Sequence, residues 1–326
     1  MRTLRWAGIG LLLCACMPSW DAPIEPGNDE PIVIEVPKGA TANGIGPKLV
    51  EAGLVQGELQ WKVYLKMGND ATCIKAGKHE VKRSQSLNEV VKSLCGAPIA
   101  DDVPFTVVEG WRIIDIDLAL SAKGLAKKGE YQKVALAKDV TTPFEITATT
   151  LEGYLYPETY MVPAAGADVK KLIERQLATF QERWLSKHQG DLGKRTLDQV
   201  VVMASMLERE EPKPANRPLV AGILWKRIDT NNGLGVDATT RYPLEDWNDN
   251  KGFLALLRDK EHPYNTRYRK GLPPTAIGNP TISSLDAALN PEPTEAWYYL
   301  HDAQGNLHPA KNAQEHEANR AKYNVY

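Results

Sequence analysis

Apolar and polar positions between Thr196 and Glu211 alternate with the period of an α-helix. Thr196 and Gln199 are spaced as a capping box, which predicts that a helix begins here. Pro212 and Pro214 cannot continue a helix, so they predict its end. The predicted inward face holds three apolar residues and one carboxylate: Leu197, Val201, Ala204 and Glu208.

Glu208 is therefore a candidate general acid. A carboxylate on a buried face loses water, which disfavours its charged form and should raise its pKa. A raised pKa suits a group that donates a proton near neutral pH. The alternative is that Glu208 only marks the solvated edge of a helix end next to two prolines.

The pattern before residue 104 predicts a small α+β unit. Its order of strand, Pro-Lys-Gly-Ala turn, helix and return strand resembles the LysM-like module of bacterial wall proteins, with a structural spacer as the alternative. The predicted segments are strands Pro31–Val36 and Glu58–Lys66, a hairpin-like segment Ile74–Val81, and helices Thr41–Ala52 and Leu87–Leu94.

A larger mixed α/β domain is predicted for residues 104–326, which makes the fold class α+β. Three segments are predicted as loops: Leu151–Tyr160, Gly235–Tyr242 and His262–Pro280. A strand and turn are predicted at Pro104–Gly110 and a closing strand at Trp297–His301. Helices are predicted at Trp111–Lys123, Asp168–Lys187, Pro218–Asp229, Ser283–Leu289 (with Ser283 as the cap) and Gln314–Tyr323.

The N-terminus has the pattern of a targeting segment. Basic residues precede an apolar run, Trp6–Leu13, that is too short to span a bilayer. Leu-Cys-Ala-Cys then resembles a bacterial lipobox, in which Cys16 is the lipidated first residue. An ordinary signal peptide and an uncleaved anchor are the alternatives. We therefore expect a lipoprotein signal peptide at 1–15, a Pro-rich flexible tether at 16–30 and the LysM-like module at 31–103.

Cysteine count and composition restrict the chemistry. Once the signal is removed and Cys16 is lipidated, Cys73 and Cys95 remain, and a disulfide is plausible in an oxidising compartment. Two buried thiols are the alternative. Neither this spacing nor the scattered histidines suggest a metal site, and we expect no cofactor. A net charge of -2 over 326 residues disfavours a nucleic-acid partner.

Tyrosines and carboxylates crowd the loop LEGYLYPETY, from Leu151 to Tyr160. Aromatic rings stack on sugar faces and carboxylates bond sugar hydroxyls, so the loop is a candidate carbohydrate site. A Tyr-rich core loop is the alternative. The polar segment Gly235–Tyr242 and the long irregular segment His262–Pro280 are further functional candidates.

Six motifs in order resemble the YceG-like endolytic murein transglycosylase family. They are LEGYLYPETY, ASMLERE, VAG-x4-RI, VDATTRY, PYNTRYRKGLPPTAIGNP and SLDAALNPEPTEAWYYL. The resemblance implies an enzyme that cuts inside peptidoglycan glycan strands, with Glu208 at the position of the catalytic glutamate. It also implies a sugar groove lined by Glu152, Tyr154, Tyr160, Asp237, Thr239, Tyr264, Asn265 and Thr266.

This chain departs from the family in two respects. Asp237-Ala238-Thr239 stands where many members have Asp-Pro-Thr, which keeps both polar residues. Many members also have a transmembrane helix, whereas this chain resembles a lipoprotein. We expect it to face the periplasm on a lipid anchor, which leaves open whether the inner or the outer membrane holds it and whether peptidoglycan synthases are partners.

The implied reaction cleaves the β-1,4 bond from N-acetylmuramic acid to N-acetylglucosamine without water and leaves a 1,6-anhydro end. Two other functions stay open. A muramidase would use water, with Glu152 or Asp237 as a second carboxylate. A non-catalytic lipoprotein would only bind the wall through the LysM-like module, and a transporter of soluble ligands is more remote.

Overall fold

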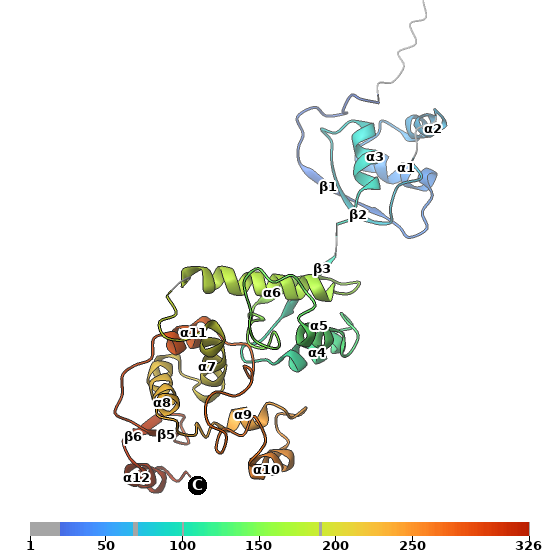
Figure 1. Ribbon diagram of the computed structural model, residues 1–326. Coiled ribbons are helices and arrows are strands. Elements are labelled where there is room, and N and C mark those ends of the chain that lie inside the picture. The colour runs from blue at the N-terminus through green and yellow to red at the C-terminus, as the bar shows by residue number, and fades with distance from the viewer. Residues whose placement is uncertain (1–19, 68–70, 100, 189–190, 326) are drawn as a thin grey trace, which may run out of the picture. The chain divides into compact units, whose positions relative to one another are not determined.

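The structure is a computed structural model that describes residues 20–67, 71–99, 101–188 and 191–325. It divides into two compact units, Met1–Asp101 and Asp102–Tyr326 (Figure 1). The division follows residue 101, where the sequence led us to expect it after residue 103. The expected signal peptide and Cys16 lie outside the described residues. No helix in the described ranges has the length and apolar character needed to cross a bilayer.

The smaller unit packs three helices on a two-stranded antiparallel sheet. Pro31 lies opposite Lys82 at one end of the strand pair, and Val36 lies opposite Gly77 at the other. Cys73 and Cys95 form a disulfide with their Cα atoms 5.0 Å apart. The elements are β1 (Pro31–Val36), α1 (Ala42–Glu51), α2 (Glu58–Lys66), β2 (Gly77–Lys82) and α3 (Leu87–Cys95).

The strand predicted at Glu58–Lys66 is wrong, because this segment is helix α2. Apolar residues at every second position, Leu59, Trp61, Val63 and Leu65, gave this segment the pattern of a strand. The two aromatic residues Trp61 and Tyr64 decide the outcome, since a helix places residues three apart on one face and both are buried. Leu59, one of the alternating residues, is left exposed as a result.

Residues 20–30, expected to belong to a flexible tether, instead lie along the smaller unit. The backbone N–H of Ser84 donates to the Asn28 carbonyl at 3.0 Å, and its hydroxyl donates to Asp29 at 2.6 Å. Trp20 meets the ring of Tyr64 edge-on, with centroids 5.4 Å apart. Although the segment is rich in proline, it packs on the smaller unit, because Ser84 and Tyr64 hold it there.

The larger unit surrounds one helix, α7 (Leu197–Glu210), with α8 (Arg217–Asp229), α9 (Asp237–Arg241) and α11 (Ile282–Leu289) (Figure 1). Two antiparallel strand pairs complete it, β3 with β4 and β5 with β6. Its other elements are β3 (Asp102–Thr106), α4 (Ile113–Ala122), α5 (Glu130–Ala137), β4 (Thr159–Pro163), α6 (Val169–Arg183), α10 (Asn250–Arg258), β5 (Tyr298–His301), β6 (Leu307–Ala310) and α12 (Ala313–Tyr323), with 3-10 turns at Leu185–Lys187 and Pro214–Asn216.

This unit differs from the sequence prediction in several details, and α5, α10 and β6 were not among the predicted segments. The segment Gly235–Tyr242, expected to be a loop, contains the short helix α9. Helix α11 begins at Ile282, so Thr281 and not Ser283 occupies the position before its first residue. The hydroxyl of Thr281 does not cap α11, because it is engaged elsewhere.

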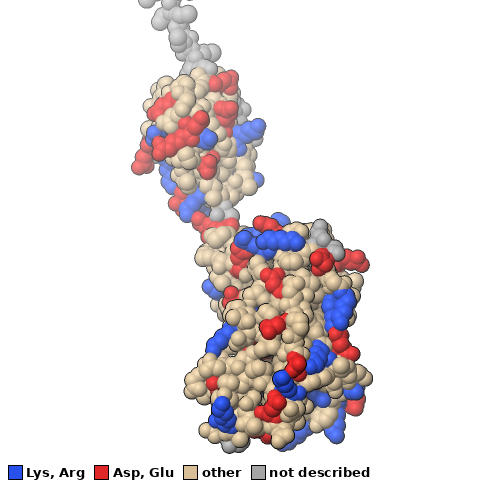
Figure 2. All heavy atoms as spheres, turned by 90° about the vertical axis from the view of Figure 1, so that its left-hand side faces the viewer, with Lys and Arg blue, Asp and Glu red and all other residues tan. Residues whose placement is uncertain are grey.

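Charged side chains of both signs are interspersed over the face of the larger unit that Figure 2 shows. This distribution agrees with the small net charge of the chain, -2. A groove for a polyanion would instead gather Lys and Arg into one patch.

Candidate functional site

Helix α7 lies in the core of the larger unit. Its predicted capping box is confirmed, since Thr196 N–H donates to Gln199 at 3.0 Å and Gln199 N–H donates back at 3.2 Å. Every residue from Val200 to Leu207 is buried, so the helix is enclosed on all sides and not only on the predicted stripe. The carboxylates at its C-terminal end, Glu208 and Glu210, therefore lie at the edge of the core, where other elements can contact them.

The carboxylate of Glu208 receives donors from two separate segments, the start of α8 and the start of α11. Arg217, at the start of α8, donates to Oε1 at 2.9 Å and to Oε2 at 3.3 Å. Thr281 donates to Oε2 twice, from its backbone N–H at 2.8 Å and its hydroxyl at 2.7 Å. The hydroxyl of Ser284 donates to the same oxygen at 2.8 Å. The Glu208 side chain is 8% exposed and points away from bulk solvent.

This environment differs from the apolar one expected for Glu208. The carboxylate is surrounded by polar donors, with five hydrogen bonds that include two from a buried guanidinium. The carboxylate also lies at the N-terminus of α11, where the helix dipole favours negative charge. The helical wheel could not show this, because the donors follow Glu208 by nine, 73 and 76 positions in the sequence.

The segment that ends at Thr281 runs beside α7. The backbone N–H of Ile277 donates to the Ser205 hydroxyl at 3.0 Å, one turn before Glu208. Asn279 accepts from the backbone N–H groups of Gly153 at 3.1 Å and Leu155 at 2.9 Å. Its amide also donates to the Trp111 carbonyl at 2.8 Å. Asn279 therefore ties the tyrosine-rich loop and the turn before α4 to the segment beside α7.

Gly153 lies where the tyrosine-rich loop packs closely against α7, and a residue with a side chain would not fit there. Its φ of +91° lies in the left-handed region that favours glycine. A Cβ atom here would lie 2.5 Å from the Ala276 Cβ and 2.6 Å from a Val201 methyl group. The glycine of LEGYLYPETY thus lets the loop approach α7 closely.

The tyrosines predicted to stack on sugar are in the core. Tyr154 is buried against Phe144 and Phe180, and its hydroxyl donates to Asp198. Tyr160 is buried too, and its hydroxyl donates to the Tyr156 carbonyl at 2.7 Å. Burial raises the pKa of both phenols. Neither ring presents an open face in this structure, which agrees with the alternative of a core loop.

Glu152 is a buried cap of another helix. Both carboxyl oxygens lie 3.1 Å from the N–H of Ile113, the first residue of α4, and Tyr242 donates to one of them at 3.0 Å. Its 2% exposure makes desolvation the largest influence, which raises the pKa of Glu152 to about 8. The muramidase alternative would need Glu152 to activate water, yet both oxygens are occupied by protein donors.

Glu152→Gln should make the larger unit more stable in alkaline solution. The folded state binds a proton on Glu152 between about pH 4.5 and pH 8, where the unfolded chain releases it. Stability from this group is therefore present at low pH and is lost as pH rises through 8. The difference between the two pKa values of Glu152 corresponds to a few kcal/mol in the free energy of unfolding. We expect the variant to match wild type at pH 5 and to unfold at a higher temperature at pH 9.

Thermal unfolding followed by circular dichroism at both pH values measures this effect. Glu158→Gln, which changes an exposed carboxylate of the same loop, is the matched control. An equal difference between Glu152→Gln and wild type at pH 5 and pH 9 would contradict the assignment.

The remaining predicted residues divide between scaffold and surface. Thr239 and Thr266 are buried and lie 3.0 Å apart through their hydroxyls. Asn265 is buried and donates to three backbone carbonyls in and after α10. Tyr264 is half-buried, with its hydroxyl 2.8 Å from that of Thr275. Asp237 alone among these is broadly exposed, at 47% of its side chain, and it pairs with Arg267 at 2.7 Å.

Sequence reasoning did not identify the donors to Glu208, which are Arg217, Thr281 and Ser284. The available signal was Arg217, a cation at the start of an apolar helix, since a buried cation needs a carboxylate. It also passed over Glu210, which accepts from the Tyr299 hydroxyl at 2.9 Å. Burial, and then the charge of Asp237, raise the pKa of Glu210.

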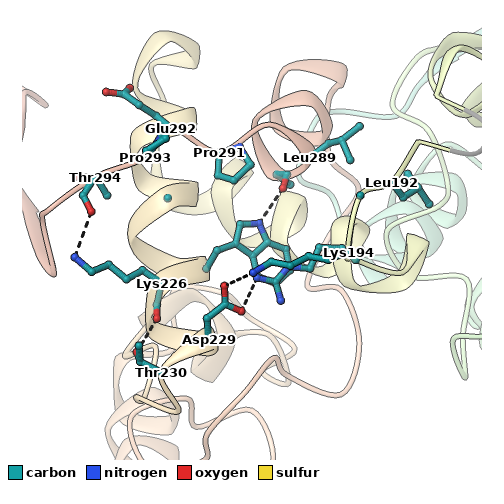
Figure 3. Close-up of a pocket in the computed structure, with 15 residues that line it drawn as sticks. Leu192, Lys194, Lys226, Asp229, Thr230, Leu289, Pro291, Glu292, Pro293 and Thr294 are labelled. Carbon is teal, nitrogen blue, oxygen red and sulfur yellow. Dashed lines mark hydrogen bonds and ion pairs between the residues drawn. The ribbon is translucent and has the colours of Figure 1, made fainter.

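A cavity of about 600 Å³ lies elsewhere in the larger unit (Figure 3). It is bounded by α8, the segment after α11 and residues 192–195, and Glu208 does not line it. Three of its charged groups bond one another, with Asp229 accepting from Lys194 at 2.8 Å and from Arg195 at 2.7 Å. Trp225 donates to the Ala288 carbonyl at 2.8 Å. The cavity therefore does not mark the carboxylate site.

Comparison with known proteins gives one consistent family. The sequence model of the YceG-like family matches residues 34–322. The endolytic murein transglycosylase of Bacillus subtilis (strain 168) is 26% identical over 320 residues, which cover 92% of this chain and 87% of that protein. The protein of the same name from Streptococcus pneumoniae (strain D39 / NCTC 7466) is 24% identical over 332 residues, which cover 92% of this chain and 60% of that protein.

A solved structure agrees with the family match. The crystal structure of a yceG-like protein from Listeria monocytogenes superposes with a TM-score of 0.58 at 25% identity. The superposition covers 89% of this chain and 99% of the Listeria chain. The chain therefore belongs to the YceG-like family.

Proposed function

We propose that this chain is an endolytic murein transglycosylase, a lyase that cuts the β-1,4 bond from N-acetylmuramic acid to N-acetylglucosamine within glycan strands. Two relatives that match 92% of the chain carry this name. The observation that carries the proposal is Glu208, a single carboxylate held by five donors at the end of an enclosed helix. Such cuts in nascent strands would limit their length.

The proposed reaction uses Glu208 in both steps. As an acid it gives a proton to the glycosidic oxygen while the bond from C1 to that oxygen breaks. As a base it takes the proton of the muramic C6 hydroxyl while that oxygen bonds to C1. No water is consumed, and one carboxylate suffices because the nucleophile belongs to the substrate.

The five donors impose a condition on the first step. They occupy both carboxyl oxygens, so Glu208 has no open position for the proton that it must donate. Oε2 carries four of the five bonds, so loss of donors there frees the oxygen for a proton. We therefore expect bound glycan to draw the hydroxyls of Thr281 and Ser284 away from Glu208. The sugar hydroxyls are suitable new partners for both groups.

The remaining parts of the proposal concern location. We expect Cys16 to carry lipid and the chain to face the periplasm from a membrane, with 1–15 removed as a signal peptide. The order β1, Pro37–Ala40 turn, α1, α2 and returning strand β2 supports a LysM-like role for the smaller unit. The disulfide between Cys73 and Cys95 agrees with an oxidising compartment. Peptidoglycan synthases are the proposed partners.

Digestion of purified glycan strands tests the function. We expect fragments from internal cuts that end in 1,6-anhydro-muramic acid, identified by mass spectrometry. Products heavier by one water would instead establish the muramidase alternative, with Asp237 as the accessible second carboxylate. Retention on insoluble wall material without any digestion would establish the non-catalytic alternative.

A further inference from the structure

Helix α2 of the smaller unit presents an apolar face to solvent. Leu59 is 75% exposed and Met67, directly after the helix, is 55% exposed. Val63 lies between them at helical spacing, and Lys62 and Lys66 flank the same side. The face borders a depression of about 540 Å³ that reaches Asn43 of α1. Apolar residues beside lysines on one helix face are typical of helices that lie in a membrane interface.

The chain enters the smaller unit at this helix. Trp20 packs edge-on against Tyr64, the residue that follows Val63. The backbone N–H of Asn88 donates to the Trp20 carbonyl at 3.4 Å, and its amide donates to Asp21 at 2.7 Å. Asn88 also accepts from the Tyr64 hydroxyl at 2.9 Å. Trp20 is thereby fixed next to α2.

The position of Trp20 limits how far α2 can be from a lipid anchor. Four residues lead from Cys16 to Trp20, and an extended chain spans at most about 3.6 Å per residue. The two residues are thus within about 14 Å of each other. This step rests on the proposed lipidation of Cys16.

We propose that the exposed face of α2 docks on the bilayer that holds the anchor. Leu59, Val63 and Met67 enter the boundary between headgroups and acyl chains. Lys62 and Lys66 meet anionic headgroups, which attract basic residues near the surface. The lipid anchor and this face together hold the smaller unit against the membrane.

Three features favour lipid over a sugar or another protein copy as the occupant. Sugar faces stack on open aromatic rings, yet the aromatic residues of α2, Trp61 and Tyr64, are both buried. Lys62 pairs with Glu58 at 3.2 Å, and both side chains are more than half exposed, so an anionic headgroup can replace that partner. The short link from Cys16 also keeps the proposed anchor within reach of α2, whereas a second copy must first be encountered.

Fluorescence quenching on the full acylated chain tests this proposal. A single cysteine is introduced by Leu59→Cys, labelled with bimane, and the protein is placed in phosphatidylethanolamine–phosphatidylglycerol vesicles containing nitroxide-labelled lipid. Val33→Cys is the matched control, because Val33 is a 55% exposed apolar residue on β1 of the same unit. We expect quenching at position 59 to be at least twofold stronger than at position 33. Adding Lys62→Glu and Lys66→Glu should reduce that difference.

The outcomes separate this proposal from the lipid anchor and from the enzyme. Intact mass reports whether Cys16 is acylated, and glycan digestion by the same sample reports activity. Equal quenching at positions 59 and 33 in acylated protein overturns the docking of α2 and leaves the anchor in place. Quenching at position 59 without acylation supports the face independently. Protection of position 59 that depends on protein concentration and not on lipid identifies a second copy and overturns the proposal.

Discussion

Glu208→Gln should abolish glycan cleavage while the chain stays folded. The amide keeps the size of the side chain but can neither give nor take the proton that each step requires. Acid–base catalysis of this kind contributes roughly 10²–10⁴ in rate, and Glu208 would serve two steps, so we expect a loss of about 10³-fold or more. Release of anhydro-ended fragments, measured by mass spectrometry over time, gives the rate, and circular dichroism checks the fold.

Glu210→Gln is the matched comparison, because Glu210 is a carboxylate two positions further on the same helix end. Its partner is the Tyr299 hydroxyl and not Arg217. We expect this variant to stay within about tenfold of wild type, well short of the effect at an acid–base residue. A fully active Glu208→Gln combined with an inactive Glu210→Gln would move the acid–base role to Glu210.

Arg217→Met should destabilise the larger unit by about 3–5 kcal/mol, because it leaves Glu208 buried without its cation. The guanidinium also donates to the Thr281 hydroxyl at 2.9 Å and to Ser283 at 2.8 Å, so these groups lose a donor as well. Thermal unfolding should show a fall in Tm of roughly 10 °C for a unit of this size.

A double-mutant cycle isolates the ion pair from the loss of packing. In the Glu208→Gln background Arg217→Met strands no carboxylate and removes a buried guanidinium that has already lost its partner, so it should cost at least about 1 kcal/mol less than in wild type. Arg217→Lys keeps the charge but not the two-pronged contact, and it should fall between wild type and Arg217→Met. An equal cost of Arg217→Met in both backgrounds would mean that the pair contributes nothing to stability.

Local patterns in the sequence were enough to predict the central helix. Thr196 and Gln199 cap each other within one turn, and Pro212 follows its end, so its limits depend on neighbours in the chain. The segment Glu58–Lys66 was different, because its apolar residues fit two periods. Only the packing of Trp61 and Tyr64 against the rest of the smaller unit decides between them.

The sequence was enough to select Glu208 as the candidate residue, but it did not predict which groups surround that carboxylate. The pattern and the family motif both selected Glu208, and its role stays a prediction. Its surroundings could not be derived, since Arg217, Thr281 and Ser284 reach it only through tertiary packing. The tyrosine-rich loop shows the same limit, because composition cannot tell a ring that faces sugar from one such as Tyr154 that is buried in the core.

The junction at Asn279 has a consequence for how the enzyme matures. The side-chain amide of Asn279 donates to the carbonyl of Trp111, 168 positions earlier. Its side-chain oxygen accepts from the N–H of Gly153, 126 positions earlier. Contacts that close such long loops form late in folding. The donors of Glu208 are therefore incomplete until the segment through Ser284 has been synthesised and has packed beside α7. We expect a chain that ends before Thr281 to be inactive even though it contains Glu208.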